Sequence, residues 1–172
     1  MSICRPRLST WVLTLVLCVA GAALTAAADP AQTEAPHEVA IIVNTENVTN
    51  QLSLGDLRRI LLGEITRWPN GRMITIAMRP PGEPERGAAL RLICGMSDAD
   101  FARYLLQAAY RGDSQSGIKL LDTANGVRRF VFNVPGAIGF VRGDDVDTSV
   151  KRLTITGAIP KQPAFGWTLG AK

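Results

Sequence analysis

The run Val39-Ala40-Ile41-Ile42-Val43-Asn44 (VAIIVN) decides the fold class of this chain. It is apolar without interruption, rich in β-branched residues, and ends at a polar asparagine. A half-exposed strand alternates apolar and polar residues, so this run instead predicts a strand buried on both faces, as in a parallel sheet. Three later segments are also predicted as strands: Met73–Met78, Ala137–Val141 and Leu153–Ile155.

Helices are predicted between these strands. Ser53 is a candidate N-cap with Asp56 three residues later, apolar residues then recur at helical spacing, and Gly63 marks the end of the helix. This alternation of strands and helices predicts an α/β sheet with helices on its faces. A second helix is predicted from Pro84 to about Cys94. A third begins after the cap Ser97 and carries an apolar stripe of Phe101, Tyr104, Leu105, Ala108 and Ala109. A fourth begins at Asp122 or Thr123, with Val127, Phe130 and Val131 facing inward.

Residues 1–28 are predicted to be a cleaved signal peptide. Two arginines precede an apolar run from Trp11 to Ala23, and Ala26-Ala27-Ala28 supplies the small residues that a signal peptidase recognises. The cut is therefore placed before Asp29. The apolar run is short for a membrane span, and an uncleaved N-terminal anchor is the alternative. We expect a periplasmic or secreted protein that meets the membrane only through the transient signal peptide.

The rest of the chain is predicted to form one domain. At 172 residues and 18.5 kDa, the chain has no room for two domains of ordinary size. Residues 29–38 contain two prolines and predict a flexible leader, in which His37 is a solvated bystander. The domain is expected to cover residues 39–157. Residues 158–172 are predicted to be a loose C-terminal tail.

The composition excludes several classes of function. Cysteine occurs only at Cys4, Cys18 and Cys94, which excludes a disulfide framework, and the single histidine argues against a histidine metal cluster. Cys94 lies in an apolar stretch and is expected to be a buried small hydrophobe. The formal charge of +4 comes from cations dispersed among acids, without the concentrated basic patch of a nucleic-acid binder.

Few local motifs suggest chemistry. The acidic run from Gly143 to Asp147 lacks the ligand spacing of a calcium loop, and Asn47-Val48-Thr49 is a weak match to a glycosylation sequon. Glu83 and Glu85 are explained by a helix N-terminus, which favours negative charge. No phosphate-binding glycine loop is present, and no nucleophile has an evident base. We therefore predict that the chain is not an enzyme and uses no metal or cofactor.

The junction from Arg79 to Arg86 is the best candidate for a binding site. It follows a predicted strand, so it lies at the carboxyl end of the sheet, where open α/β folds bind ligands. Helix N-terminal amides attract anions, and Arg79 and Arg86 offer two guanidinium groups to grip one. A capped surface loop with two ordinary salt bridges explains the same residues equally well.

Four stretches together resemble the phosphate-type periplasmic substrate-binding proteins of ABC transporters. The resemblance covers about Val39 to Val141 and is closest to the short, single-lobe members, whose Gly-x-Pro-x-Arg segment is matched by Gly82-Glu83-Pro84-Glu85-Arg86. The four stretches are Val39–Asn44, Ser53–Trp68, Ile76–Gly82 and Pro135–Val141.

The resemblance implies a single lobe of the type II periplasmic binding protein-like fold, with a mixed sheet and helices on both faces. It also implies a small phosphate-like anion as ligand and a transporter permease or another envelope protein as partner. The ligand-binding residues that it implies are Asn44, Thr45, Arg79, Gly82 and Arg86.

The anion loop departs from the family pattern. Full-length phosphate binders have Arg-x-Ser-Gly-Ser-Gly-Thr or similar there, whereas Pro81 and Pro84 lack amide donors, and Glu83 and Glu85 add negative charge. Two hypotheses therefore stand. One is an extracytoplasmic solute-binding-like protein for phosphate or another small anion, serving an ABC uptake system. The other is a ligand-free binding-protein lobe that acts as an interaction or sensory module.

Overall fold

The structure is a computed structural model that describes residues 37–112, 117–157 and 167–170. Residues 1–36, which include the predicted signal peptide and most of the predicted leader, lie outside the described residues. Within the described part of the chain, no helix is long and apolar enough to cross a membrane.

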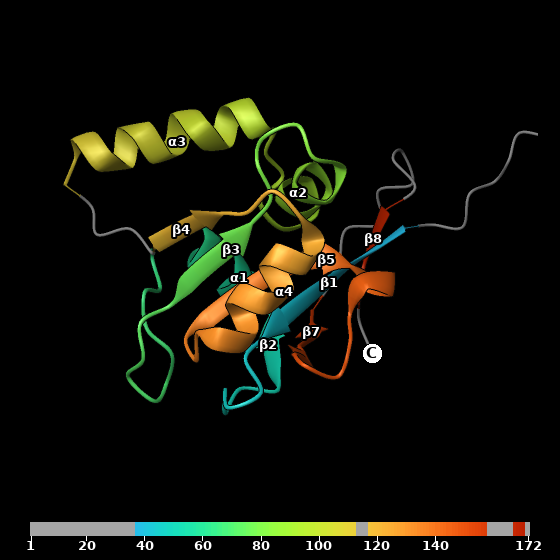
Figure 1. Cartoon of the computed structure of the whole chain (residues 1–172). Coiled ribbons are helices and arrows are strands. Elements are labelled where there is room, and N and C mark those ends of the chain that lie inside the picture. The colour runs from blue at the N-terminus through green and yellow to red at the C-terminus, as the bar shows by residue number, and fades with distance from the viewer. Residues whose placement is uncertain (1–36, 113–116, 158–166, 171–172) are drawn as a thin grey trace, which may run out of the picture. The chain divides into compact units, whose positions relative to one another are not determined.

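A mixed sheet forms the centre of the domain (Figure 1). Its strand order is β4-β3-β5-β1-β6, and β8 also pairs with β1. A separate two-stranded sheet joins β2 to β7. The strands are β1 (His37–Val43), β2 (Gln51–Ser53), β3 (Thr75–Met78), β4 (Gly117–Leu120), β5 (Ala137–Arg142), β6 (Lys151–Arg152), β7 (Thr154–Thr156) and β8 (Trp167–Leu169).

The strand directions correct one sequence prediction. β3, β4 and β5 are parallel to one another, but β1 runs antiparallel to both β5 and β6 and parallel only to β8. The five residues Val39–Val43 are nevertheless fully buried. The continuous apolar run therefore indicates that both faces of the sheet are covered, and it does not predict the direction of the strand.

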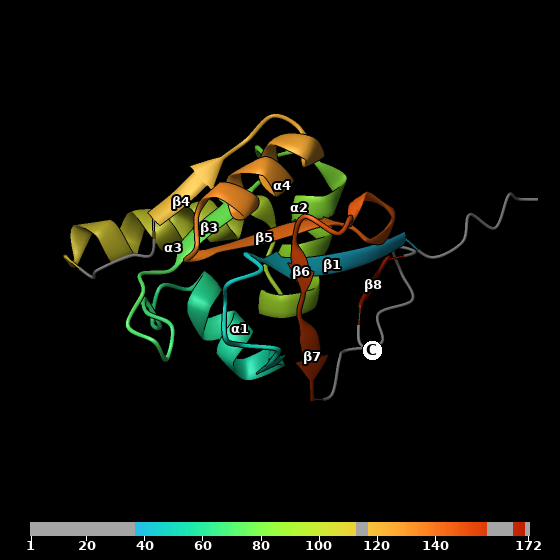
Figure 2. The same cartoon turned by 60° about the horizontal axis from the view of Figure 1, so that its bottom comes forward.

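Helices cover the two faces of this sheet, as predicted. Figure 2 shows α4 on one side of the sheet and α1 on the other. Successive side chains of β1 therefore enter different cores. Ala40 and Ile42 pack with Val127 and Val131 of α4. Val39, Ile41 and Val43 point to the other face and join the larger core with α1 and α2. The helices are α1 (Leu54–Leu61), α2 (Pro84–Ala89), α3 (Asp98–Tyr110) and α4 (Ala124–Asn133), with a π-helix η1 (Leu90–Cys94) and a 3-10 turn η2 (Gly143–Asp145).

The predicted helix boundaries agree closely with the structure. The Ser53 hydroxyl accepts a hydrogen bond from the Asp56 amide at 3.0 Å, and Ser97 caps α3 in the same way through Asp100 at 3.2 Å. Pro84 is the first residue of α2, where its missing N–H has no intrahelical partner. Gly95 ends η1 in the left-handed region with φ of 69°.

Two glycines before and within β5, Gly136 and Gly139, have no room for a side chain. A Cβ on Gly136 would collide with the carbonyl oxygen of Met73, and one on Gly139 would lie 2.9 Å from the methyl groups of Val127 and Val131. Trp68 is 4% exposed and donates from Nε1 to the Gly136 oxygen at 3.0 Å. The ring therefore packs against the end of the sheet, as predicted.

Several local predictions are wrong. Strand β4 was not predicted, because its exposed and half-buried residues show no apolar alternation. The segment predicted as a loose tail contains β8, which pairs with β1, and His37 belongs to β1 with its ring 5.0 Å from that of Trp167. Ala109, predicted to face inward, is exposed, because α3 packs mainly through Phe101 and Ala108.

Candidate functional site

The predicted anion loop connects the end of β3 to the start of α2. Gly82 adopts φ of 93°, a conformation that glycine accepts at low cost, and it turns the chain so that Pro84 can begin α2. The loop therefore lies at the carboxyl end of β3, as the sequence predicts. Its two arginines, however, are already bound to carboxylates of the same chain.

Arg86 is held in the interior. Its side chain is 5% exposed, and Nε donates to Oδ1 of Asp98 at 2.6 Å. One terminal nitrogen donates to the carbonyl oxygen of Arg79 at 3.0 Å and contacts the Met78 sulfur at 2.9 Å. The guanidinium also lies 5.8 Å from the centre of the Phe101 ring, within cation–π range. Arg86 is therefore a structural centre of the loop.

The carboxylate of Asp98 is bound by two donors of the loop. Besides Arg86, its carboxylate accepts a long hydrogen bond of 3.4 Å from the backbone amide of Gly82. These are one side-chain donor and one loop-amide donor, the two kinds of group that an anion loop offers a ligand. Asp98 lies at the start of α3, twelve residues after Arg86. Only the fold brings its carboxylate to the loop.

The other loop charges are also paired. Arg79 forms an ion pair with Glu83 at 2.7 Å, and the side chain of Arg79 is 15% exposed. Buried Glu85 pairs with Arg142 at 3.2 Å, and Arg142 in turn lies over the ring of Trp167. The predicted roles of Glu83 and Glu85 as partners of a helix N-terminus are therefore incomplete, because both bind arginines.

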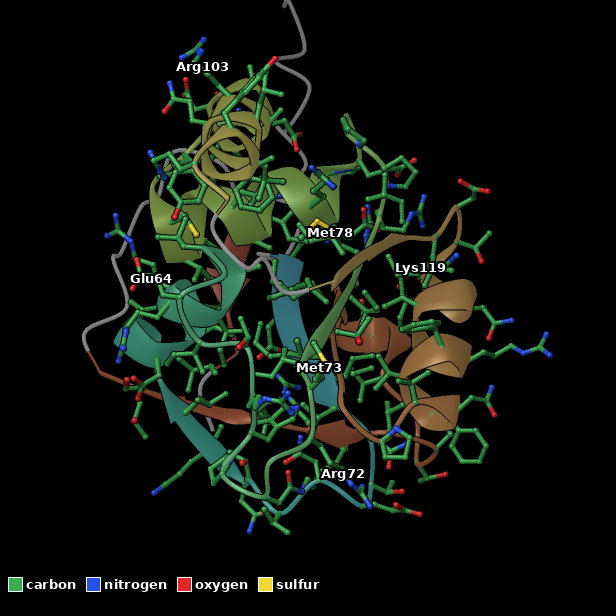
Figure 3. All side chains as sticks on the ribbon, turned by 90° about the vertical axis from the view of Figure 1, so that its left-hand side faces the viewer. Glu64, Arg72, Met73, Met78, Arg103 and Lys119 are labelled. Carbon is green, nitrogen blue, oxygen red and sulfur yellow. The ribbon has the colours of Figure 1, made fainter. Side chains whose placement is uncertain are left out.

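Asn44 and Thr45 lie away from this loop. Because β1 is antiparallel and β3 parallel to β5, the residues after β1 lie at the opposite edge of the sheet from those after β3. In Figure 3, Met73 precedes β3 at the lower end of the sheet, whereas Met78 lies at the other end beside α2. Asn44 and Thr45 thus form no common site with the three loop residues.

Asn44 has a structural role. It is buried and donates from its amide nitrogen to the carbonyl oxygens of Val131 and Phe132, at 3.0 Å and 2.6 Å. Its side-chain oxygen accepts from the backbone amide of Glu46 at 2.9 Å. The side chain therefore satisfies carbonyl groups at the end of α4 that have no intrahelical partner. Thr45 is exposed.

The weaker motifs have structural explanations. In the acidic run, Asp147 pairs with Arg128 at 2.7 Å, and its pKa is lowered, chiefly by hydrogen bonds from Ser149. No cluster of three or more metal-ligating side chains occurs among the described residues. Asn47 of the sequon is 3% exposed, so its amide is inaccessible to a modifying enzyme in the folded chain. Cys94 is buried, as predicted, and burial raises its pKa to about 11.

A cavity opens beside the loop. Its accessible volume is about 340 Å³, and the paired carboxylates of Glu83 and Asp98 belong to its wall. Such a volume suits a small ligand, but the wall presents two acids to one arginine. The lining residues are Gly82, Glu83, Pro84, Gly87, Ala88, Arg91, Leu92, Asp98 and Trp167.

The chain is similar in sequence to a known phosphate-binding protein. It is 27% identical over 135 residues to the phosphate-binding protein PstS of Bacillus subtilis, a match that spans 73% of this chain and 40% of that protein. The chain is therefore similar to part of a phosphate-binding protein. No protein-family model matches the chain.

Solved structures of phosphate-binding relatives share the fold. An ABC-type phosphate transport receptor from Vibrio cholerae superimposes with a TM-score of 0.57 at 22% identity, covering 73% of this chain and 48% of the receptor. PstS from Borrelia burgdorferi gives 0.56 at 14% identity, covering 73% and 49%. The chain thus spans about half the length of these relatives. The Bacillus subtilis protein is named for phosphate binding and the Vibrio cholerae receptor for phosphate transport.

Proposed function

We propose that this chain is an extracytoplasmic binding-protein lobe that acts as an interaction module and does not carry free phosphate. The observation that supports this proposal is the position of Asp98, whose carboxylate accepts from both Arg86 and the Gly82 amide. The loop that would hold the ligand is thereby neutralised from within the chain. A permease or another envelope protein is the proposed partner.

The energetics disfavour free phosphate at this loop. A charge-assisted hydrogen bond contributes about 1.5–3 kcal/mol, and phosphate would have to break the one between Arg86 and Asp98 before forming its own. The displaced carboxylate would then repel the incoming anion, as would Glu83 beside Arg79. We expect a Kd for phosphate of about 1 mM or weaker, which corresponds to only ~4 kcal/mol.

Phosphate carriage is the second candidate. The observation that favours it is the 27% identity to a protein named as phosphate-binding, together with the position of the loop at the carboxyl end of β3. In this alternative, an ABC permease would be the partner, and the lobe would bind the anion with Arg79 and Gly82. Genes for a permease and an ATPase beside the coding gene would favour it.

Calorimetry of the purified protein separates the two candidates. Phosphate, sulfate, molybdate and small carboxylates are titrated into the wild type, into Arg79→Ala, and into the control variant Arg129→Ala on exposed α4 surface. The interaction-module proposal expects no binding tighter than about 1 mM for inorganic phosphate. Micromolar phosphate binding that Arg79→Ala abolishes and Arg129→Ala preserves would overturn it in favour of phosphate carriage.

A further inference from the structure

A second cavity lies on the α1 side of the sheet and differs in charge from the cavity beside the loop. Its accessible volume is about 470 Å³, and Arg58 and Arg91 are the charged residues among the described part of its lining. That described lining contains no carboxylate, in contrast to the two acids beside the loop. The lining residues are Ser53, Leu54, Gly55, Arg58, Arg91, Leu92, Ile93, Cys94, Gly95, Thr156 and Gly157.

Two carboxylates close to Arg58 in the sequence, Asp56 and Glu64, are engaged elsewhere. Asp56 accepts a hydrogen bond from the Ser53 hydroxyl at 2.8 Å and lies 3.6 Å from Arg59. Glu64 pairs with the same Arg59 at 3.4 Å. Within the described ranges, the side chain of Arg58 forms no ion pair and no hydrogen bond. Its positive charge is therefore available to a ligand.

The charge of Arg58 acts on the cavity wall. Cys94 lines the cavity, and burial raises the pKa of its thiol to about 11, with Arg58 opposing that rise through its positive charge. This opposition means that the guanidinium is close enough for its field to favour a negative charge at Cys94. An anion inside the cavity would be favoured by the same field.

The cavity also has an apolar side. Leu92 and Ile93 are almost fully buried beneath it, and Leu54 is half-buried at its edge. Arginine recognises carboxylate and phosphate through paired N–H donors, and an apolar surface beside it favours a ligand with a hydrophobic body. We propose that this cavity binds a small organic anion, with its carboxylate or phosphate group at Arg58 and its apolar body against Leu54 and Leu92.

Three probes test the proposal by calorimetry on the full chain: phenyl phosphate, benzoate and inorganic phosphate. We expect saturable binding of phenyl phosphate, of benzoate, or of both, and weaker binding of inorganic phosphate, which lacks the apolar body. Arg58→Gln should weaken the binding about tenfold or more, because it removes one charge-assisted contact. Arg58 does not line the cavity beside the loop, and Arg129→Gln is the matched control.

The Arg58 variant also locates the bound probe. Saturable heat that Arg58→Gln leaves unchanged would overturn the proposal, because the probe would then bind elsewhere.

The remaining outcomes separate this proposal from the proposed function. If no probe gives saturable heat, the cavity proposal fails and the interaction-module proposal is unaffected. If inorganic phosphate binds tightly, Arg58→Gln leaves the affinity unchanged and Arg79→Ala abolishes it, then phosphate binds at the loop. The interaction-module proposal would fail in that case, whereas the cavity proposal fails only if the organic probes do not bind or bind independently of Arg58.

Discussion

Replacement of Asp98 by asparagine tests whether this side chain stands in for a bound anion. The substitution keeps the shape of the side chain and removes its charge, so Arg86 would remain in the interior without a counter-ion. Removal of one partner from a buried ion pair costs about 3–5 kcal/mol. The Asp98 side chain is 26% exposed, and we therefore expect the lower end of this range, about 3 kcal/mol.

The expected loss converts to a measurable shift. For a domain of this size, 1 kcal/mol changes Tm by about 3–4 °C, so Asp98→Asn should melt about 10 °C below the wild type. The freed Arg86 and the Gly82 amide should also accept phosphate. With a Kd of about 1 mM, phosphate at about 20 mM would restore about 1.8 kcal/mol, or about 5–7 °C.

Thermal melts with and without phosphate decide this prediction. Asp100→Asn is the matched control, because Asp100 lies in the same first turn of α3 but pairs at the surface with Arg103. We expect a smaller loss of stability for the control and a smaller response to phosphate, because Asp98 still competes for the loop in the control. If Asp98→Asn melts like the wild type, or if phosphate raises the Tm of both variants equally, then Asp98 does not hold the place of an anion.

Three other predictions concern stability and export. Trp68→Ala should lower the free energy of unfolding by about 3–5 kcal/mol in urea titrations, because the ring is buried and its nitrogen is hydrogen-bonded; an unchanged midpoint would contradict this packing role. The pKa values of Asp100 and Asp147 are lowered from 3.8, so the two carboxylates stabilise the fold above that pH and this stabilisation is lost as the pH falls below it. The double variant with asparagine at both positions should therefore show a flatter dependence of stability on pH under about pH 4. Intact-mass measurement of protein from the cell envelope should give an N-terminus at Asp29, and a mass that retains residues 1–28 would show an uncleaved anchor.

The sequence predicts those parts of the fold that depend on neighbouring residues. The cap at Ser53, the proline that begins α2 and the glycine after η1 are local signals, and each was placed correctly. β4 and β8 are short, and most of their residues are exposed or half-buried, so no apolar alternation reveals them. Their pairing with β3 and β1 is decided by tertiary contacts that no local pattern encodes.

The candidate site was predicted less completely than the fold. Arg79, Gly82 and Arg86 were placed correctly at one loop, because a loop after a strand lies at a defined edge of the sheet. Asp98, the residue after the predicted cap Ser97, was not predicted to contact the loop, and Arg142, 57 residues from its partner Glu85, was not considered. Only spatial proximity shows that both neutralise the loop, and the capping signal at Ser97 was the one local sign that a carboxylate would lie nearby.

The pairing of β8 with β1 brings the two ends of the described domain together. His37 lies opposite Trp167 in a parallel register, and the amide of Gly170 donates to the carbonyl oxygen of Val39 at 3.0 Å. A linker of a few residues would therefore reach from one end to the other, and circular permutation should leave the sheet intact. The same closeness lets such a lobe be inserted into a surface loop of a host protein, because the polypeptide would enter and leave the lobe at nearly one point.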